Sequence, residues 1–584
     1  VVATGEDTEV GKISTMLSSQ ETRQTPLQEE LDKVGKKLSI AAGVIIVIVF
    51  LVGILVHTAG IGEMFLTAVA LAVAAIPEGL PAVVTIVLSI GVTRMAKQHA
   101  IVKKLPAVET LGATSIICSD KTGTLTQNRI RLAEVVLRNE KKSSSDYQSQ
   151  ENIPAELESL LRIGVLNSEA SITKSEDGSY DEVGDQTEVA LLIAADQLGM
   201  DVATMEDDYS TLYEIPFDSE KKYMVSVLQK EGSDNVSILI KGAPEVLLSL
   251  AQLSAEDKTY WNQAVNDLAQ EGLRTLGFGM KELSKDDWDA ISANEEKIVE
   301  GFSFIGMVGE RDPLRPEVID ALNTAKKAGI KTVMITGDHK LTALSIAKEL
   351  GLASNESEVL TGSELANMDD DALRNKIESI HVYARVNPEQ KLRLVKMYQE
   401  VTSAKIAVTG DGVNDAPAIK AGDIGVAMGI EGTDVTREVA DLVLEDDNYA
   451  TIVTAVKEGR VIFANLVKFI RYLISCNISE IFIVFFAILL GYPAPLLPIQ
   501  LLWVNLVTDG LPALALGMDS PESDVMDQAP RDDSEGILTK SRWLHMSLEG
   551  LVMGLGALAC FMYIDVHYGD DIARTVAFTT LSLS

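Results

Sequence analysis

Long apolar segments occupy both ends of the chain, and a more polar region, 96–455, separates them. Buried core helices of a soluble protein are also apolar, but segments this long, arranged in pairs and bracketed by basic residues, favour helices that cross a bilayer. We therefore predict an integral, multi-pass membrane protein with apolar segments at 39–57, 65–92, 472–492, 496–517, 545–564 and 572–584.

Basic residues beside these segments predict their orientation, because membrane proteins keep an excess of Lys and Arg on the cytoplasmic side. We expect region 96–455 to be cytoplasmic, and the membrane to be the plasma membrane if the protein is prokaryotic. The supporting residues are Lys33, Lys36 and Lys37 before the first segment, Arg94, Lys97, Lys103 and Lys104 after the second, and Arg460, Lys468 and Arg471 before the third.

The polar region has the pattern of an α/β fold. Three short apolar runs each end in an acidic turn, at Ile116 to Asp120, Thr332 to Asp338 and Ile406 to Asp411. Because the carboxyl ends of parallel strands meet at one edge of a sheet, we expect these carboxylates to gather there. Between 128 and 308 the chain has polar loops and apolar strands of its own. We interpret this stretch as an inserted domain in which 141–150 is a mobile loop.

The amino-acid composition limits which binding partners and which cellular compartment are plausible. The 584 residues carry a net charge of −35, which argues against nucleic acid or an anionic membrane surface. Hydrophobic residues make up 47% of the chain, which is high for a wholly soluble protein. The cysteines Cys118, Cys476 and Cys560 show no pairing pattern, which fits a reducing compartment without disulfides. No obligate protein partner is evident.

The most informative motif is the turn after the first apolar run, Cys118-Ser119-Asp120-Lys121-Thr122-Gly123-Thr124-Leu125-Thr126. An Asp at a strand end can simply cap a turn. Beside a hydroxyl and the amides of a tight turn, however, its carboxylate can attack a phosphoryl group and form an aspartyl phosphate. The complete nine-residue motif is too specific to be explained by an Asp that only caps a turn.

A second motif, Thr409-Gly410-Asp411-Gly412-Val413-Asn414-Asp415, adds carboxylates to the same edge. Clustered carboxylates repel one another unless a cation neutralises them, so the pattern indicates bound Mg²⁺. Thr336-Gly337-Asp338 adds a hydroxyl and amides, and Lys391 adds a positive charge.

These motifs resemble those of P-type ATPases, membrane pumps of the haloacid-dehalogenase-like superfamily. The resemblance implies that Asp120 is phosphorylated, and that Asp120, Asp411 and the Thr122 carbonyl bind Mg²⁺. It also implies a haloacid-dehalogenase-like α/β (Rossmann-like) phosphorylation domain, an inserted α+β nucleotide-binding domain and an α-helical transmembrane bundle. The remaining implied residues of the phosphate site are Lys121, Thr336, Gly337, Asp338, Lys391, Asn414 and Asp415.

The resemblance also implies an ATP site in the inserted domain. An adenine needs a flat apolar partner, and its phosphates need nearby cations. In the family's calcium pumps an Arg often follows the stacking Phe by two positions, where this chain has Ser219. The implied residues are Glu188 at the base edge, Phe217 stacked on the ring, Lys222 and Lys241 lining the pocket, Arg274 at the phosphates and Arg315 as a further nucleotide contact.

Three carboxylates, Glu78, Glu480 and Asp509, lie inside apolar segments. Each costs about 2.5–3.5 kcal/mol to insert, and no Lys or Arg within the membrane offsets them, so bound cations or protons must. Helical spacing groups further oxygen donors with them, since Asn477 is three residues from Glu480, and Asn505 and Thr508 precede Asp509 by four and one.

Pro77 lacks an N–H, so the Val73 carbonyl loses its helical partner and is free to bind an ion. Carboxylate, amide, hydroxyl and carbonyl oxygens suit Ca²⁺ better than a soft metal.

From Thr8 to Gly510 the motifs resemble those of the sarco/endoplasmic-reticulum type of calcium pump. The resemblance implies one ion site from Glu78, Asn505, Asp509 and the carbonyls of Val73, Ala74 and Ile76, and most of a second from Asn477, Glu480, Thr508 and Asp509. The implied domains are an actuator end and connector (1–38), the family's spans 3–4 (39–95), the phosphorylation domain (96–127 and 309–455), the nucleotide-binding domain (128–308), and spans 5–7 with part of 8 (456–584).

One motif is interpreted as a decoy. Thr4-Gly5-Glu6 resembles the Thr-Gly-Glu-Ser dephosphorylation loop of the family's actuator domain, but it leads directly into the connector at Thr8. We therefore expect the true loop to lie upstream of Val1 and the second ion site's last ligand beyond Ser584. Such a fragment is not expected to turn over on its own.

Three alternatives remain at this point. The pump could carry Mn²⁺, Na⁺ or H⁺ instead of Ca²⁺, although Asn505 and Glu480 together favour Ca²⁺. A soluble phosphatase of the same superfamily is disfavoured by the paired apolar segments. A non-pumping binding module would be left if the actuator were missing.

Overall fold

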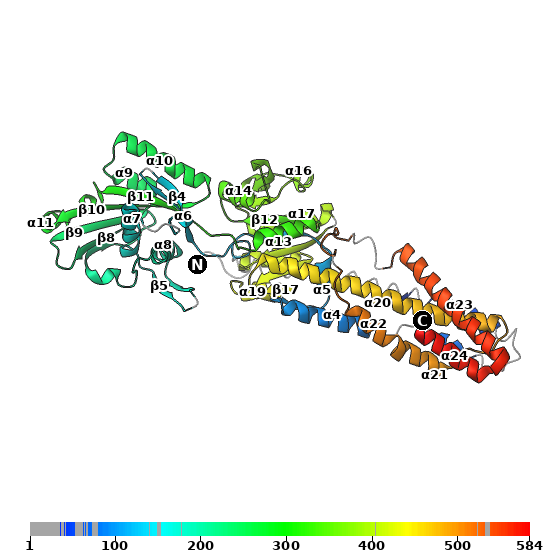
Figure 1. Cartoon of the computed structure of the whole chain (residues 1–584). Coiled ribbons are helices and arrows are strands. Elements are labelled where there is room, and N and C mark those ends of the chain that lie inside the picture. The colour runs from blue at the N-terminus through cyan, green and yellow to red at the C-terminus, as the bar shows by residue number, and fades with distance from the viewer. Residues whose placement is uncertain are drawn as a thin grey trace, which may run out of the picture.

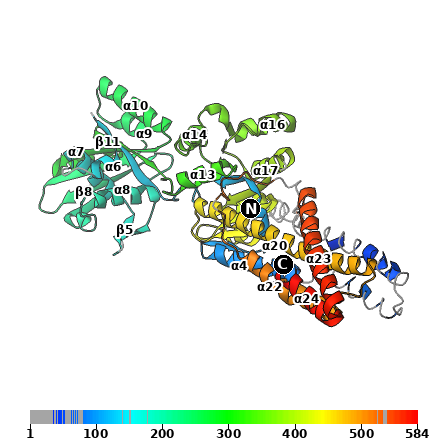
Figure 2. The same cartoon turned by 45° about the vertical axis from the view of Figure 1, so that its right-hand side comes forward.

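The computed structural model describes residues 80–584 except 139, 149–152, 177, 403, 523 and 532–537, with a few scattered positions before residue 80. Parts of the predicted spans 39–57 and 65–92 therefore lie outside the described residues, as does Thr4-Gly5-Glu6. Figure 1 shows three consecutive parts, with one sheet and its helices at one end, a second sheet in the middle and the long helices at the other end. Figure 2 shows the same succession after a 45° turn.

The middle part is built on an eight-stranded sheet with the order β1-β17-β16-β15-β2-β12-β14-β13. All neighbouring strands are parallel except β1, which runs antiparallel to β17 at one edge. The strands are β1 (Ala100–Val102), β2 (Thr114–Asp120), β12 (Lys331–Thr336), β13 (Val359–Thr361), β14 (Val382–Ala384), β15 (Lys405–Gly410), β16 (Ile424–Met428) and β17 (Leu442–Leu444).

This sheet is buried on both faces, which explains why its strands are continuously apolar. In β2, Ile116 and Cys118 pack into the core on one face, whereas Ile117 packs into the core on the other. The surrounding helices are α5 (Ala107–Gly112), α13 (Val318–Lys327), α14 (Lys340–Glu349), α15 (Gly362–Ala366), α16 (Asp370–Lys376), α17 (Pro388–Thr402), α18 (Ala416–Ala421) and α19 (Asp434–Val439).

A seven-stranded antiparallel sheet forms the end part, with the order β4-β3-β11-β10-β9-β8-β7. Its strands are β3 (Arg131–Leu137), β4 (Glu140–Ser143), β7 (Tyr209–Ile215), β8 (Tyr223–Lys230), β9 (Asn235–Gly242), β10 (Arg274–Ser284) and β11 (Ser303–Arg311). β11 runs past the predicted domain boundary at 308/309, because pairing with β3 continues to Arg311.

Helices cover both faces of this sheet. Trp261 and Trp288 belong to the core on one face and Phe278 to the core on the other. The expectation of a loop at 141–150 is wrong for its described part, where Tyr147 is buried in the second core. The other elements are the hairpin β5 (Ser171–Lys174) and β6 (Tyr180–Val183) and the helices α6 (Ser144–Gln148), α7 (Ala155–Leu166), α8 (Gln186–Gln197), α9 (Pro244–Leu250), α10 (Ala255–Gln270), α11 (Lys285–Ile291) and α12 (Glu295–Val299).

Among the described residues, three helical segments are long and apolar enough to cross a membrane: Tyr449–Leu489, Pro498–Gly517 and Lys540–Tyr568. The first is α20, the second joins α21 (Pro498–Trp503), a π-helical turn (Val504–Thr508) and α22 (Gly510–Gly517), and the third is α23. α4 (Leu80–Ala96) is apolar but shorter, and α24 (Asp570–Leu583) has only 14 residues.

α20 begins well before the predicted segment 472–492 and joins the helices to the middle sheet (Figure 1). Its first residue, Tyr449, is fully buried and shares a hydrogen bond of 2.6 Å with Thr332 of β12. Farther along, Gly459 packs so closely on Gly112 of α5 that a Cβ on either residue would lie 2.7 Å from the other's backbone.

Candidate active site and ion-binding residues

Asp120 lies at the carboxyl end of β2, between β12 and β15. Its backbone N–H donates a 2.9 Å hydrogen bond to the Thr409 hydroxyl of β15, which ties the two strand ends together. Ile335 is its register partner on β12. The three acidic strand ends that the sequence pattern singled out are thus neighbours in the sheet.

Lys391 is the cation that contacts Asp120 at this edge. It is 3% exposed and its ammonium donates to Asp120 Oδ2 at 3.2 Å and to Asp415 Oδ1 at 2.8 Å. Burial alone would lower the pKa of Lys391, but the carboxylates of Asp415 and Asp120 outweigh it and hold the pKa above its usual value. Lys391 is therefore charged in this setting and holds Asp120 in place.

Three carboxylates remain crowded despite that cation. Carboxylate oxygens of Asp120, Asp411 and Asp415 all lie within 4.8 Å of one another. Burial and repulsion from Asp120 and Asp415 raise the pKa of Asp411 to about 6, and burial is also the main cause of the raised pKa of Asp120. A hard divalent cation fits this donor set, because it would offset the repulsion with oxygen ligands.

The turn after Asp120 is held by long-range contacts. Gly123 has φ +71°, a left-handed conformation that glycine adopts without steric cost. Arg315 donates to the Gly123 carbonyl at 2.8 Å and to the Thr126 carbonyl at 3.2 Å. Lys121 forms an ion pair of 3.0 Å with Asp338. In this structure Arg315 stabilises the turn through these hydrogen bonds.

The remaining predicted residues of the phosphate site border the same edge. Thr336 is buried at the end of β12 and its hydroxyl accepts the N–H of Asp338 at 3.1 Å. Thr122 is half-buried, and Gly337 and Asn414 are exposed.

The predicted nucleotide residues of the end part lie on α8 (Glu188), β9 (Lys241) and β10 (Arg274), and in the loop between β7 and β8 (Phe217 and Lys222). Lys241 is buried and forms an ion pair of 2.5 Å with Glu188, whose other oxygen accepts the N–H groups of Glu169 and Ala170. Phe217 is 62% exposed, as a platform for a planar ligand would be. Lys222 has φ +59°, in a turn closed by its N–H to the Asp218 carbonyl.

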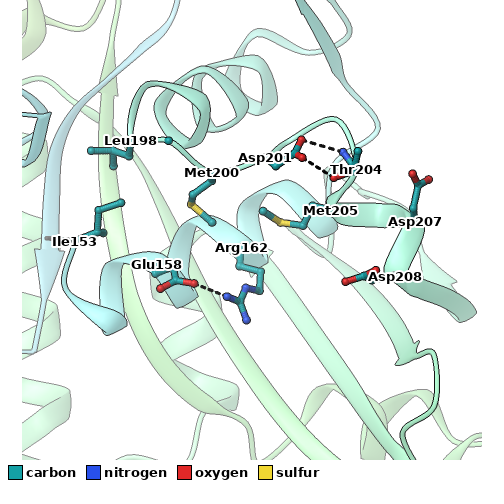
Figure 3. Close-up of a pocket in the computed structure, with 11 residues that line it drawn as sticks. Ile153, Glu158, Arg162, Leu198, Met200, Asp201, Thr204, Met205, Asp207 and Asp208 are labelled. Carbon is teal, nitrogen blue, oxygen red and sulfur yellow. Dashed lines mark hydrogen bonds and ion pairs between the residues drawn. The ribbon is translucent and has the colours of Figure 1, made fainter.

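A cavity of about 660 Å³ lies elsewhere on this part of the chain (Figure 3). The loop after α8 and the helix α7 line it, and none of the predicted nucleotide residues does. Two pairs of its polar groups bond to each other: Arg162 donates to Glu158, and the Thr204 hydroxyl donates to Asp201. The lining residues are Ile153, Glu158, Arg162, Leu198, Gly199, Met200, Asp201, Thr204, Met205, Asp207 and Asp208.

Among the predicted ion ligands, those on α20 and on the π-helical turn come together. The Asn505 amide donates to Glu480 Oε2 at 3.2 Å. Asn477, Glu480 and Asp509 are each at most 4% exposed. Within the described chain, Glu480 Oε1, Asp509 Oδ2 and Asn477 Nδ2 are buried without a hydrogen-bond partner.

Local helix geometry favours a ligand at this place. The N–H of Asp509 bonds to the Val504 carbonyl at 2.8 Å, five residues back, and π-helical turns of this kind frequently mark functional sites. Thr508 is half-buried in the same turn. The predicted ligands Val73, Ala74, Ile76 and Glu78 lie outside the described residues.

Sequence reasoning missed two residues that shape the phosphate site. Thr409 stands inside a motif that was singled out, but its hydrogen bond to Asp120 is not visible in the sequence. Asp312 accepts the Thr126 hydroxyl at 2.5 Å and the Arg129 N–H at 3.2 Å, and these bonds join the two chain segments that connect the sheets. Its position just before Pro313 was the only signal.

The site is therefore an acidic strand edge with two buried lysines, Lys121 and Lys391. The helix α20 joins this edge to buried carboxylates among apolar helices. Two family models match the chain, "P-type ATPase, cytoplasmic domain N" at residues 156–317 and "Cation transporting ATPase, C-terminus" at residues 493–584.

Curated relatives match along nearly the whole chain. A calcium-transporting ATPase of Bacillus subtilis is 44% identical over 100% of this chain and 68% of its own length. A calcium-transporting ATPase of Saccharomyces cerevisiae is 36% identical over 99% of this chain and 63% of its own. A cation-transporting ATPase of Synechocystis is 38% identical over 100% of this chain and 66% of its own length. The chain belongs to the P-type ATPases.

Proposed function

We propose that this protein is an ATP-driven calcium pump that works through an aspartyl phosphate on Asp120. The observation that carries the proposal is the strand edge where Asp120 contacts Lys391 and lies within 4.8 Å of Asp411 and Asp415. Relatives named calcium-transporting ATPases support Ca²⁺ as the transported ion. Three long apolar helices argue against the soluble phosphatase.

The domain assignment follows from the two sheets. We assign the eight-stranded sheet to a haloacid-dehalogenase-like phosphorylation domain, the seven-stranded sheet to the nucleotide-binding domain and the apolar helices to a transmembrane bundle. The basic flanks of the spans support a cytoplasmic location for both sheets. In a prokaryote the membrane would be the plasma membrane.

Phosphoryl transfer would use the groups already at the edge. An Asp120 carboxylate oxygen attacks the γ-phosphorus of ATP, the bond to the β-phosphate oxygen breaks, and ADP leaves. Lys391 and Lys121 offset the charge on the phosphoryl oxygens, and the Thr336 hydroxyl and the Gly337 and Asp338 amides lie beside them. Water later displaces Asp120 and releases phosphate.

Asp120, Asp411 and the Thr122 carbonyl would hold Mg²⁺, with Asp415 supporting the loop. When bound, Mg²⁺ neutralises charge on the phosphate and on these carboxylates. The raised pKa of Asp411 means that metal binding has to favour its charged form.

Phe217, Lys222, Lys241, Glu188 and Arg274 would hold the nucleotide. The exposed ring of Phe217 supports stacking on adenine, and the Glu188–Lys241 pair supports a polar floor below the base. Arg315 belongs instead with the turn after Asp120, because its hydrogen bonds go to that turn.

The transported ion would bind between α20 and the π-helical turn, at Asn477, Glu480, Asn505, Thr508 and Asp509. Buried carboxylate oxygens without partners support a cation there, because an unpaired charge at that depth is costly. A full oxygen ligand set suits Ca²⁺. Glu78 and the carbonyls of Val73, Ala74 and Ile76 would complete it.

The test is labelling of the full chain in detergent with γ-labelled ATP, Mg²⁺ and Ca²⁺. We expect an acid-stable, hydroxylamine-sensitive phosphoenzyme that Asp120→Asn abolishes and Asp320→Asn, an exposed aspartate of the same domain, retains. Normal labelling of Asp120→Asn would refute the assignment. Labelling that needs Mn²⁺ or Na⁺ with Ca²⁺ chelated would refute the choice of ion alone.

A further inference from the structure

Glu310 is a buried carboxylate beside the proposed nucleotide site that no function yet uses. It is 0% exposed on β11, and neither carboxylate oxygen has a hydrogen-bond partner within the described part of the chain. An ionised carboxylate in such a place costs far more than a neutral one. Glu310 therefore has a physical reason to hold a proton.

Its neighbour across the sheet is Arg274, the residue proposed to meet the nucleotide phosphates. Arg274 and Glu310 are register partners on β10 and β11, so their side chains leave the same face of the sheet. Arg274 is exposed, and no carboxylate of the described residues lies within ion-pair distance of it. An arginine and a glutamate are thus adjacent in the sheet without forming an ion pair.

Other groups around Glu310 leave the local charge unbalanced. Lys241 on β9 acts on it from one side but is already paired with Glu188, and Asp185, the N-cap of α8, repels it. On β3 the residue opposite Glu310 is the apolar Leu132. Asp185, Glu188 and an ionised Glu310 would give three negative charges against two positive ones.

Burial, opposed by Arg274 and reinforced by Asp185, raises the pKa of Glu310 to about 8. Nucleotide phosphates near Arg274 would add negative charge and raise this pKa further. An ionised Glu310 would also draw the Arg274 guanidinium back toward the sheet. A protonated one leaves Arg274 free to extend into solvent, as it does here.

We propose that Glu310 is a positioning residue that takes up a proton when nucleotide binds, so that its neutral form leaves Arg274 free for the phosphates. The inference rests on the proposed nucleotide site. By linkage, proton uptake on binding means that the affinity for nucleotide falls as pH rises past the pKa of the free protein. The fall approaches tenfold per pH unit for one proton.

The experiment is titration of the full chain in detergent with ADP between pH 7 and 9.5, where the phosphates of ADP are already ionised. For the wild type we expect constant affinity up to about pH 8 and a loss above it. Glu310→Gln should bind as the wild type does at pH 7 and keep that affinity at pH 9. The matched control is Glu134→Gln, a partly buried glutamate of β3 near Lys141, Glu271 and Arg311, and it should retain the wild-type profile.

A wild-type pH profile in Glu310→Gln would overturn the proposal, and so would equally tighter binding at every pH, because Glu310 would then act as a fixed charge. If the variant does not fold, calorimetry of the wild type at pH 8.5 in two buffers of different ionisation enthalpy decides. We expect net proton uptake, and none would refute the idea. The nucleotide site fails separately, if Phe217→Ala and Arg274→Met leave ADP affinity unchanged.

Discussion

Replacing Lys391 by Met should make the stability of the eight-stranded sheet depend strongly on Mg²⁺. Lys391 is 3% exposed and contacts both Asp120 and Asp415, at 3.2 and 2.8 Å. Met fills a similar volume without charge. Together with Asp411, the wild-type cluster has three carboxylates and one ammonium and a net charge of −2, whereas the variant cluster has a net charge of −3.

Removing one partner of a buried ion pair typically costs about 3–5 kcal/mol, because the remaining charges lose their compensation. Bound Mg²⁺ brings the net charge of the wild-type cluster to 0 and that of the variant cluster to −1. The metal therefore relieves more repulsion in the variant, and we expect Mg²⁺ to recover a larger share of stability there. The deficit without metal should deepen from pH 6 to 8, because Asp411, with a pKa of about 6, ionises across that range.

Hydrogen exchange of peptides from β2 and β15 is the suitable measurement, since it gives local opening free energies. Tryptophan fluorescence would be less specific, because none of Trp261, Trp288, Trp503 and Trp543 lies on a strand of this sheet. The matched control is Lys396→Met, an exposed lysine of the same helix α17. Unchanged exchange in EDTA, or a Mg²⁺ effect no larger than in the wild type, would refute the reasoning.

Four further predictions are checked by phosphoenzyme labelling and ADP binding. Thr409→Val removes the acceptor of the Asp120 N–H, and phosphorylation should slow about tenfold while Thr409→Ser retains the rate, as single-turnover labelling would show. Arg315→Met should also slow labelling but leave ADP affinity unchanged, because Arg315 contacts the turn carbonyls. Weaker ADP binding by this variant would show that Arg315 is a nucleotide contact after all. Since Asp411 has a pKa of about 6 and must be charged to bind metal, the Mg²⁺ concentration for half-maximal labelling should rise as pH falls below 6, by up to tenfold per unit. Glu480→Gln, near-isosteric but neutral, should raise the Ca²⁺ concentration needed for phosphorylation from ATP by at least tenfold. Glu549→Gln, a half-buried glutamate of α23 that pairs with Arg471, should not.

The phosphate edge was accessible to sequence reasoning because local signals define it. Each of Asp120, Asp338 and Asp411 follows an apolar run, and parallel strands bring such ends together. What remained hidden depends on contacts between distant residues. Arg315 lies 192 residues from Gly123, whose carbonyl it binds, and nothing in its own neighbourhood indicates that partner.

Two further differences arise because local polarity is a poor guide where one side chain is buried. The polar stretch from 141 was expected to be a loop, yet Tyr147 anchors it in the core beside β3. The segment 472–492 was bounded by hydropathy, which drops at Lys468 and Arg471, while the helix itself begins at Tyr449. Hydropathy detects the part of a helix that suits lipid, not the part that packs on a sheet.

This longer helix supplies a physical path between the two proposed sites. From Tyr449 to Asn477 and Glu480, α20 spans about 42–46 Å at 1.5 Å per residue, and it contains no proline. Its start is bonded to Thr332, on the strand next to Asp120, and the close contact of Gly459 with Gly112 ties it to α5. A continuous helix transmits a displacement of its end instead of absorbing it, because bending at an unbroken turn strains the backbone hydrogen bonds. A shift of the sheet edge on phosphorylation would therefore move Asn477 and Glu480 relative to Asn505, whose helix is interrupted by the π-helical turn.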